Sequence, residues 1–411
     1  MTTTTAPISE DAFTQSVRAF LDAHARRKDA LGNEQDSLVG DAVTITKRFQ
    51  RALFDAGLAG LTFPIEYGGQ GLPRAYQEIF TREAAAFVLP TFAITISHGM
   101  CLPILNDFGT HEQRERHLRK IISAEEIWCQ MFSEPGAGSD VASLQTRAEL
   151  DGDQWIINGQ KVWTSGAQYC DFGLCLARTD VDVPKHEGIS MFIVDMRAPG
   201  VDIRPLRQIT GDADFNEIFF TDVRIPRTSL VGELNRGWNV AVAMLMYERV
   251  ALGAGGSGPM ASRHFDRLVE IARTHARADD APTRQALADF YIRETILRYV
   301  GLRIRDALKA GRAPGPEGSI AKLASAQLAV LGANIASAIA GPAAVAWSSE
   351  DRGGDQVARG VLGAPAIGIA GGTNEVQRNI IAERVLGLPK EPSADKGVPF
   401  KDLLVGTQRR G

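Results

Sequence analysis

The stretch Met131-Phe-Ser-Glu-Pro-Gly-Ala-Gly-Ser-Asp140 divides the chain into two regions of different character. A charged, helix-like segment from Thr110 to Glu126 precedes it, and a long region with strand character follows it. Pro135 fixes one backbone angle, and Gly136 and Gly138 allow a sharp turn or the close approach of a ligand. The short polar side chains that can bind backbone groups or a ligand are Ser133, Ser139 and Asp140. A plain turn and a ligand-binding loop both fit these residues.

Hydrophobic periodicity on either side of this stretch predicts helices, then strands, then helices again. Apolar residues recur at three-to-four spacing over residues 10–60 and 76–86, and again from Gly237 through residue 386. Between them, Asp153–Trp163 predicts two strands joined by a turn at Asn158-Gly159. We therefore expect an α+β fold that consists of an N-terminal helical domain at 1–127, a β domain at 128–235, a C-terminal helical domain at 236–390 and a loose polar tail at 391–411.

Composition excludes several classes of protein. The chain has 411 residues, of which 44% are hydrophobic and 23% charged, and its formal net charge is -4. These values are typical of a soluble globular protein and argue against nucleic-acid or anionic-membrane binding. The start lacks the features of a signal peptide, and the longest apolar stretch, Val240–Tyr247, falls far short of the roughly 18 residues of a membrane span. The four cysteines are scattered, and Cys170 and Cys175 have no matching second pair and no nearby histidine, so we expect a reduced, cytoplasmic protein without a metal site.

Two further segments are candidates for chemistry. Glu248 and Arg249 lie in a predicted helix that is apolar on nearly every side, so they form either an ion pair at a helix edge or a buried catalytic base with its partner. Small residues from Gly363 lead to Thr373, which is placed to cap the next helix. The start of that helix offers free N–H groups to a ligand, although a plain loop-to-helix junction would look the same.

Taken together, these motifs resemble the acyl-CoA dehydrogenase family of flavoproteins over residues 10–390. The matching motifs, in the family's order and spacing, are Glu66-Tyr-Gly-Gly-Gln-Gly71, Phe108-Gly-Thr110, Ser133–Asp140, Asn158-Gly-Gln-Lys-Val-Trp-Thr-Ser165 and Gly372–Pro389. The resemblance implies a β-barrel-like middle domain and a C-terminal four-helix bundle. It also implies FAD bound between them, and an assembly that is a homotetramer or homodimer.

The resemblance assigns roles to residues at matching positions. Residues that would line or cover the flavin ring are Gln130, Phe132, Ser133, Trp163 and Ser165, and Ser165 falls where the family bonds flavin N5. Ser139 would meet the pantetheine arm of CoA. Residues that would touch FAD elsewhere are Thr373, Glu375 and Gly341, the last in the region that receives the adenine end of a neighbour's FAD.

Two departures from the family pattern bear on mechanism. Many members carry the catalytic glutamate where this chain has Gly371, preceded by Ala370, but a second group supplies it from the helix after the β domain. Glu248-Arg249 matches that second position. Glu248 would then be the base, Gly371 would supply a backbone N–H to the enolate oxygen, and Arg249 would orient Glu248 or support CoA.

The second departure concerns the FAD pyrophosphate. The usual Arg-x-x-Phe-Gly contact is missing from Arg273–Arg284, so the pyrophosphate is held differently or across a different subunit interface.

The resulting expectation is FAD-dependent α,β-desaturation of an acyl-CoA, with electrons passed to an electron-transferring flavoprotein. Because Ala370 and Gly371 leave a hollow, we expect a bulky or branched acyl group. Two alternatives stay open. One is a flavin oxidase or monooxygenase on the same fold, and the other is a subunit of a heteromeric acyl-CoA dehydrogenase.

Overall fold

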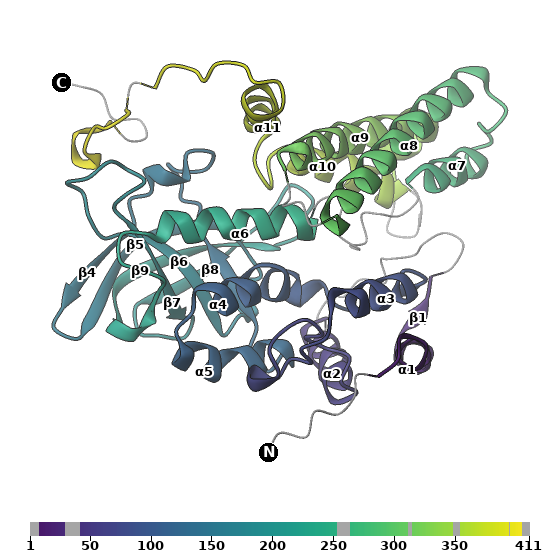
Figure 1. Cartoon of the computed structure of the whole chain (residues 1–411). Coiled ribbons are helices and arrows are strands. Elements are labelled where there is room, and N and C mark those ends of the chain that lie inside the picture. Colours follow the sequence, from purple (N-terminus) through teal and green to yellow (C-terminus); the bar gives the residue numbers. More distant parts are fainter. Residues whose placement is uncertain are drawn as a thin grey trace.

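A computed structural model describes residues 8–28, 42–252, 264–310, 315–347, 354–393 and 395–404. Its N-terminal part is helical (Figure 1), with the helices α1 (Glu10–His24), α2 (Ala42–Asp55), α3 (Arg74–Ala84), α4 (Leu102–Phe108) and α5 (His111–Ile122). A π-helical turn, η3 (Ser97–Cys101), leads into α4, and the short strands β1 (Arg26–Arg27) and β2 (Phe87–Val88) pair antiparallel. Thr110 and Gln113 form a capping box that fixes the start of α5.

The middle of the chain forms an eight-stranded sheet in the order β10-β7-β6-β4-β5-β9-β8, with β3 paired to β6. The strands are β3 (Trp128–Met131), β4 (Arg147–Asp151), β5 (Gln154–Ser165), β6 (Phe172–Arg178), β7 (Ile189–Asp195), β8 (Val201–Leu206), β9 (Phe215–Pro226) and β10 (Leu230–Val231). β6 and β7 are buried along nearly their whole length, which matches their continuous apolar sequences.

The predicted Asn158-Gly159 hairpin turn is wrong. β5 runs unbroken through these residues, and the chain reverses instead between Asp151 and Gln154, where Gly152 has a φ of 63°. Gly159 lies at a register shift between β5 and β9, and a Cβ there would come within 2.5 Å of Thr146 Oγ1. The glycine is therefore needed because β5 passes close to Thr146 at this point, and it does not form a turn.

Helices return after the sheet, as expected, with α6 (Gly237–Leu252), α7 (His264–Thr274), α8 (Ala281–Lys309), α9 (Glu317–Ala340), α10 (Gly354–Ile367) and α11 (Asn374–Ile380). α6 contacts β7 of the sheet as well as η3 and α4 of the N-terminal part, and it runs along the upper side of the sheet in Figure 1. α7 to α10 pack together around their own apolar core, which includes Leu268, Phe290 and Ile339. The α+β class with a C-terminal helical bundle is confirmed.

Among the described residues, one segment, Glu317–Ala344, is long and apolar enough to cross a membrane by length and composition. The expectation that no stretch approaches the length and apolar character of a membrane span was therefore wrong. α9, which makes up most of the segment, contacts α7, α8, α10 and α11. Its apolar character accordingly fits the central helix of a bundle.

The tail predicted to be loose is docked in part. The backbone at Pro399 forms an antiparallel bridge with Pro184, and the Phe400 side chain is buried against the β domain. This segment follows an extended stretch that leads from α11 back across the molecule (Figure 1).

Candidate active site

The glycine-rich turn after β3 is anchored at its first end by a buried ion pair. Glu134 Oε1 lies 2.8 Å from Lys161 Nζ, and the Lys161 side chain is fully buried in the middle of β5. The backbone N–H groups of Gln145 and Thr146 also donate to the Glu134 carboxylate. Burial alone would raise the pKa of Glu134, but Lys161 and these hydrogen bonds lower it below its ordinary value. Glu134 is therefore a charged structural anchor.

The rest of the turn is exposed except for Ala137, which is buried and exchanges backbone hydrogen bonds with Glu134. A Cβ added at Gly136 or Gly138 would meet no atom of the described chain within 4 Å, and Ser139 and Asp140 lie on the surface. Asp140 is tied down by Lys185 at 2.8 Å and accepts a short hydrogen bond from Ser143. The turn thus presents an open surface that is held at both ends.

The end of β3 and the end of β5 lie side by side. Ser133 O accepts a hydrogen bond of 2.9 Å from Val162 N. Gln130 and Ser133 are half-buried, and Phe132 is buried. The residues predicted to lie against the flavin from these two segments are therefore brought close together.

Trp163 combines exposure with backbone strain. Its side chain is 60% exposed, and its φ of 60° is rarely adopted by a bulky residue. The ring meets Phe215 edge to face at 5.8 Å, and the residue sits at a second register shift between β5 and β9. Strained residues of this kind cluster at ligand sites. An exposed indole is also a suitable surface for a flat aromatic ligand.

The loop between β8 and β9 connects this region to the C-terminal helices. Gly166 N donates to Asp214 O, and Arg359 of α10 forms an ion pair of 3.1 Å with Asp212. Ser165, half-buried at the end of β5, therefore lies in a segment that is linked through this loop to α10.

Glu248 and Gly371 lie next to each other. An ideal Cβ at Gly371 would be 3.6 Å from Glu248 Oε1, and Gly371 has a φ of 67°. Gln377 Nε2 donates to Gly371 O at 2.8 Å and fixes this loop. The carboxylate of Glu248 thus reaches the space into which a side chain at position 371 would project. Ala370 is exposed, and the side chain of Arg249 lies outside the described part of the chain.

Orphaned polar atoms gather around the loop that precedes α11. Thr373 caps α11 by accepting from Val376 N, and Glu375 pairs with Arg378 on the surface. Among the described residues, the buried polar atoms without a hydrogen-bond partner include Asn374 Oδ1, Gln377 Oε1 and, on α9, Lys322 Nζ. Burial lowers the pKa of Lys322, and nearby Glu375 opposes this shift. A ligand with both donors and acceptors, as FAD has, fits this set.

Sequence reasoning missed Lys322. Its signal was available, because Lys322 is the only basic residue in the apolar run Glu317–Ala340.

Gly341 lies directly after α9, with a φ of 57° and a ψ of -130° that favour glycine. Its predicted contact is to a neighbouring subunit, so the single chain leaves that role a prediction.

The stretch Arg273–Arg284, which lacks Phe-Gly, has a structural role at the start of α8. Arg277 forms an ion pair of 3.2 Å with Asp280, and the Asp280 carboxylate accepts a hydrogen bond from the backbone N–H of Thr283.

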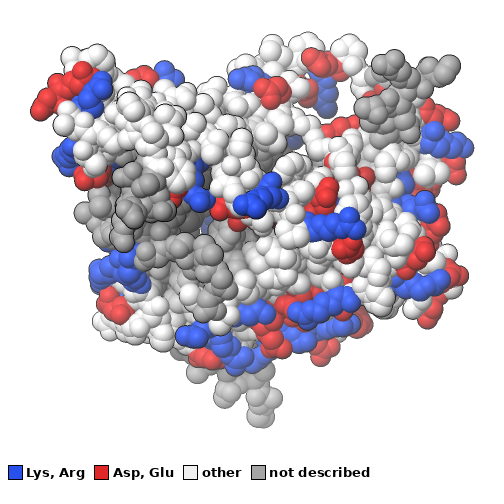
Figure 2. All heavy atoms as spheres, turned by 180° about the vertical axis from the view of Figure 1, so that it is seen from behind, with Lys and Arg blue, Asp and Glu red and all other residues white. Residues whose placement is uncertain are grey.

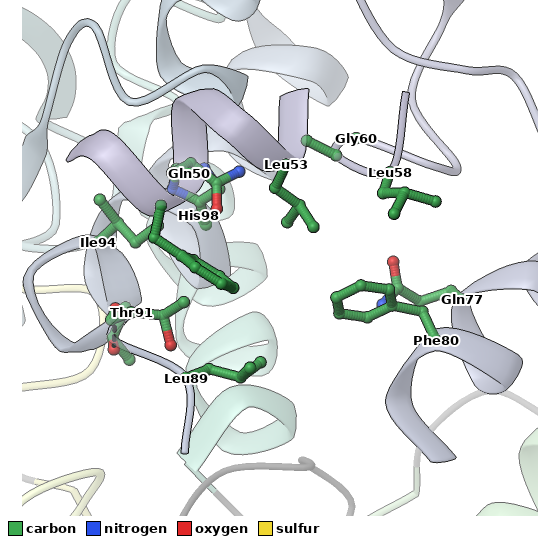
Figure 3. A pocket seen from close by; sticks show the side chains of 13 residues that line it. Gln50, Leu53, Leu58, Gly60, Gln77, Phe80, Leu89, Thr91, Ile94 and His98 are labelled. Carbon is green, nitrogen blue, oxygen red and sulfur yellow. Dashed lines mark hydrogen bonds between the residues drawn. The ribbon is translucent and has the colours of Figure 1, made fainter. Parts of the chain in front are cut away.

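Figure 3 shows the side chains around a cavity of about 250 Å³ among the N-terminal helices. It is lined mainly by apolar residues of α2, α3 and the segment 89–98, together with Gln50 and His98. None of the residues predicted to bind FAD or CoA lines it. The cavity therefore shares no residue with the candidate active site.

The chain matches three family models along most of its length. They describe the acyl-CoA dehydrogenase N-terminal domain at residues 8–125, the middle domain at 129–223 and the C-terminal domain at 235–386. Acyl-CoA dehydrogenase IpdE1 of Mycobacterium tuberculosis is 41% identical over 345 residues, covering 84% of this chain and 88% of that protein.

Solved structures agree with this match. A structure described as the Tcur3481-Tcur3483 steroid ACAD has a TM-score of 0.77 at 28% identity, covering 94% of this chain and 99% of that chain. The ChsE4-ChsE5 complex of Mycobacterium tuberculosis has a TM-score of 0.75 at 28% identity, covering 95% and 100%. On these matches and the fold described above, the chain belongs to the acyl-CoA dehydrogenase family of oxidoreductases.

Proposed function

We propose that the protein catalyses FAD-dependent α,β-desaturation of a bulky or branched acyl-CoA and passes the electrons to an electron-transferring flavoprotein. The observation that carries this proposal is the position of the Glu248 carboxylate beside Gly371. In this arrangement Glu248 accepts the α proton of the thioester. The backbone N–H of Gly371 donates to the oxygen on which negative charge develops, and a preplaced donor lowers the barrier to such a step.

The remaining predicted contacts belong to the same proposal. Trp163 and Ser165 cover one edge of the flavin, and the other residues in contact with FAD are Gln130, Phe132, Ser133, Thr373, Glu375 and Gly341. Ser139 meets the pantetheine arm, and Arg249 orients Glu248 or supports CoA. Bound FAD supplies the acceptor for the hydride that leaves the β carbon.

The choice of a bulky acyl group rests on two observations. Ala370 and Gly371 have almost no side chain, so they leave room beside Glu248. One structural relative, matched as the unaltered protein and as its G363A variant, is described as a steroid ACAD, and a relative from Syntrophus aciditrophicus, 33% identical over 224 residues, is named cyclohexane-1-carbonyl-CoA dehydrogenase. We therefore propose a ring-bearing acyl chain.

A visible spectrum tests the activity directly. We expect the pure protein to be yellow, and anaerobic addition of a ring-bearing acyl-CoA such as cyclohexane-1-carbonyl-CoA to bleach the flavin band faster than butyryl-CoA does. Fastest bleaching by butyryl-CoA would contradict the bulky acyl group. Re-oxidation that requires an added electron-transferring flavoprotein supports dehydrogenation, whereas rapid hydrogen peroxide formation in air would instead indicate an oxidase.

The assembly is proposed to be a homotetramer or homodimer, with a heteromer as the second candidate. The heteromer has two specific observations in its favour. The chain lacks Arg-x-x-Phe-Gly in Arg273–Arg284, and two structural relatives are described by two protein names joined together. Purification of this chain alone decides between them, because a colourless protein that gains FAD only with an unlike partner chain would indicate the heteromer.

We also propose a cytoplasmic location, since the four cysteines are free and buried, as is usual in a reducing compartment.

A further inference from the structure

The C-terminal segment Asp395–Leu404, here called the clamp segment, packs against the β domain near the Ser139–Asp140 turn. Phe400 N donates to Val183 O at 2.9 Å, and Lys401 N donates to Val181 O at 3.0 Å. The Phe400 side chain is only 6% exposed. The clamp segment is thus held on the loop between β6 and β7 by these hydrogen bonds, by one isolated bridge at Pro399 and by the short 3-10 helix Phe400–Asp402.

Arg178, at the end of β6, joins the clamp segment to the chain that follows the turn. Its guanidinium carbon lies 3.7 Å from the centroid of the Phe400 ring. The same group donates to Lys185 O and Ala142 O, each at 2.6 Å. Burial lowers the pKa of Arg178 to about 10, so it stays protonated at neutral pH.

Lys185 connects the clamp segment to the turn itself. Its Nζ lies 2.8 Å from Asp140 Oδ2 and 2.5 Å from Asp395 Oδ2, and its side chain is 13% exposed. Burial would lower the pKa of Lys185, but the two carboxylates raise it above its ordinary value. The hydrogen bond from Lys185 lowers the pKa of Asp395 to about 2. Lys185 and Asp395 are therefore both charged at neutral pH.

The first half of the turn is restrained, because Ala137 is buried and exchanges backbone hydrogen bonds with Glu134, whereas residues 138–140 are exposed. Gly136 and Gly138 contact no atom of the described chain at the Cβ position, and Ser139 is exposed. Buried Lys161 holds the Glu134 end, and Lys185 holds the Asp140 end. Because Asp140 is half exposed, its pair with Lys185 would contribute little if Lys185 were itself free to move.

We propose that the clamp segment, acting through Lys185, holds the Ser139–Asp140 turn in the position that receives the CoA arm. The inference rests on the proposed function, in which Ser139 contacts CoA. Lys185 is a positioning residue here, since it acts through Asp140. Loss of the clamp weakens CoA binding and raises KM while kcat is retained, because Glu248 lies on α6 and not on the turn.

The test is calorimetric titration of free coenzyme A into the FAD-loaded protein. We expect roughly tenfold weaker binding for a chain that ends at Ser393, for Asp395→Asn and for Lys185→Ala, since a small displacement of a positioning group has effects of this order. Lys185→Arg keeps the bridge and should bind as the unaltered protein does. The matched control is Arg224→Ala, which breaks an exposed ion pair with Asp151 elsewhere on the β domain and should leave binding unchanged.

Kinetics with the acyl-CoA that bleaches fastest should then show a raised KM and an unchanged kcat in the three weakened variants. If Lys185→Ala binds weakly but Asp395→Asn and the shortened chain bind normally, Lys185 contacts CoA directly and the clamp is overturned. Normal binding by all variants overturns it as well.

An unaltered protein that does not bind CoA would contradict the proposed function instead, so the two failures are distinguishable. Circular dichroism and flavin absorbance report whether the shortened chain folds. If it does not fold, Asp395→Asn and Lys185→Ala carry the test, with Lys185→Arg as the variant that keeps the bridge.

Discussion

At the scale of single residues, carboxylates of identical chemistry acquire different roles from their surroundings. Glu134 belongs to the Met131–Asp140 motif, yet it is buried, paired with Lys161 and held by two backbone N–H groups. Glu248 comes from an apolar helix and lies beside Gly371, where a catalytic glutamate is missing. The motif identifies the family, and the residue far from it along the chain supplies the base in our proposal.

The Lys161–Glu134 pair should be essential for stability. Lys161→Met keeps the length of the side chain but leaves a buried carboxylate unpaired, and we expect the free energy of unfolding to fall by about 3–5 kcal/mol. Denaturant unfolding followed by circular dichroism measures this loss. Lys161→Met combined with Glu134→Leu should recover most of it, because no buried charge remains. Unchanged stability in Lys161→Met would contradict the account of this pair.

Trp163 should lower the stability of the fold through its strained backbone and strengthen FAD binding through its exposed ring. Asparagine tolerates a positive φ better than tryptophan, so Trp163→Asn should raise the free energy of unfolding of the FAD-free protein by about 1 kcal/mol. The same change removes the exposed ring and should speed FAD release. Thermal unfolding of the FAD-free protein and fluorescence of released FAD measure the two effects. A variant that is destabilised and retains FAD normally would refute this role.

At the scale of elements, the order of helices and strands could be predicted from apolar periodicity, whereas several local features could not. Asn158-Gly159 is a favoured turn pair, but Gly159 is needed where β5 passes close to Thr146. That contact depends on strand pairing, which a local pattern does not contain. The docking of the tail was missed for the same reason, since Phe400 finds its partner Arg178 only in the fold.

The candidate site was predictable in part. The proximity of Glu248 to Gly371 joins two segments that are far apart in sequence, and only the family resemblance indicated it. Lys322, the single cation of α9, was missed because no motif surrounds it.

His98, which lines the cavity among the N-terminal helices, should make the free energy of unfolding depend on pH. Burial lowers the pKa of His98 to about 4, whereas an unfolded histidine titrates near 6.5. Between these values the unfolded chain binds a proton that folded His98 does not, so stability should fall as pH decreases from about 6.5 to about 4. Thermal unfolding across this range measures the slope. His98→Gln should flatten it while His275→Gln does not, and equal slopes in all three proteins would contradict the assignment.

At the scale of the whole molecule, α6 contacts both the sheet and the N-terminal helices and carries Glu248 near its C-terminal end. Acidic and basic side chains gather along the lower edge of the rear face, and much of the face above is uncharged (Figure 2). The C-terminal helix α8 has a row of apolar side chains that are each more than half exposed in the described chain. These are Ile292, Ile296 and Tyr299.

This row should be covered in the assembled protein, because exposed apolar stripes mark interaction surfaces. We expect the chain to elute above its 44.4 kDa monomer mass in size-exclusion chromatography with light scattering. Ile296→Glu should weaken the assembly by roughly tenfold or more. A matched change on the charged side of α8, Arg293→Glu, should have a smaller effect. A monomer that retains FAD and activity would contradict a shared site.

The central claim is that Glu248 is the base. The direct measurement is the rate of anaerobic flavin reduction by acyl-CoA in FAD-loaded Glu248→Gln, with Glu149→Gln, an exposed carboxylate on β4, as the control. We expect Glu248→Gln to slow reduction by at least about 10²-fold while FAD stays bound, and Glu149→Gln to leave it unchanged. Adding Gly371→Glu to Glu248→Gln returns a carboxylate to the same space and should restore part of the rate. Flavin reduction at the unaltered rate in Glu248→Gln would show that the base lies elsewhere.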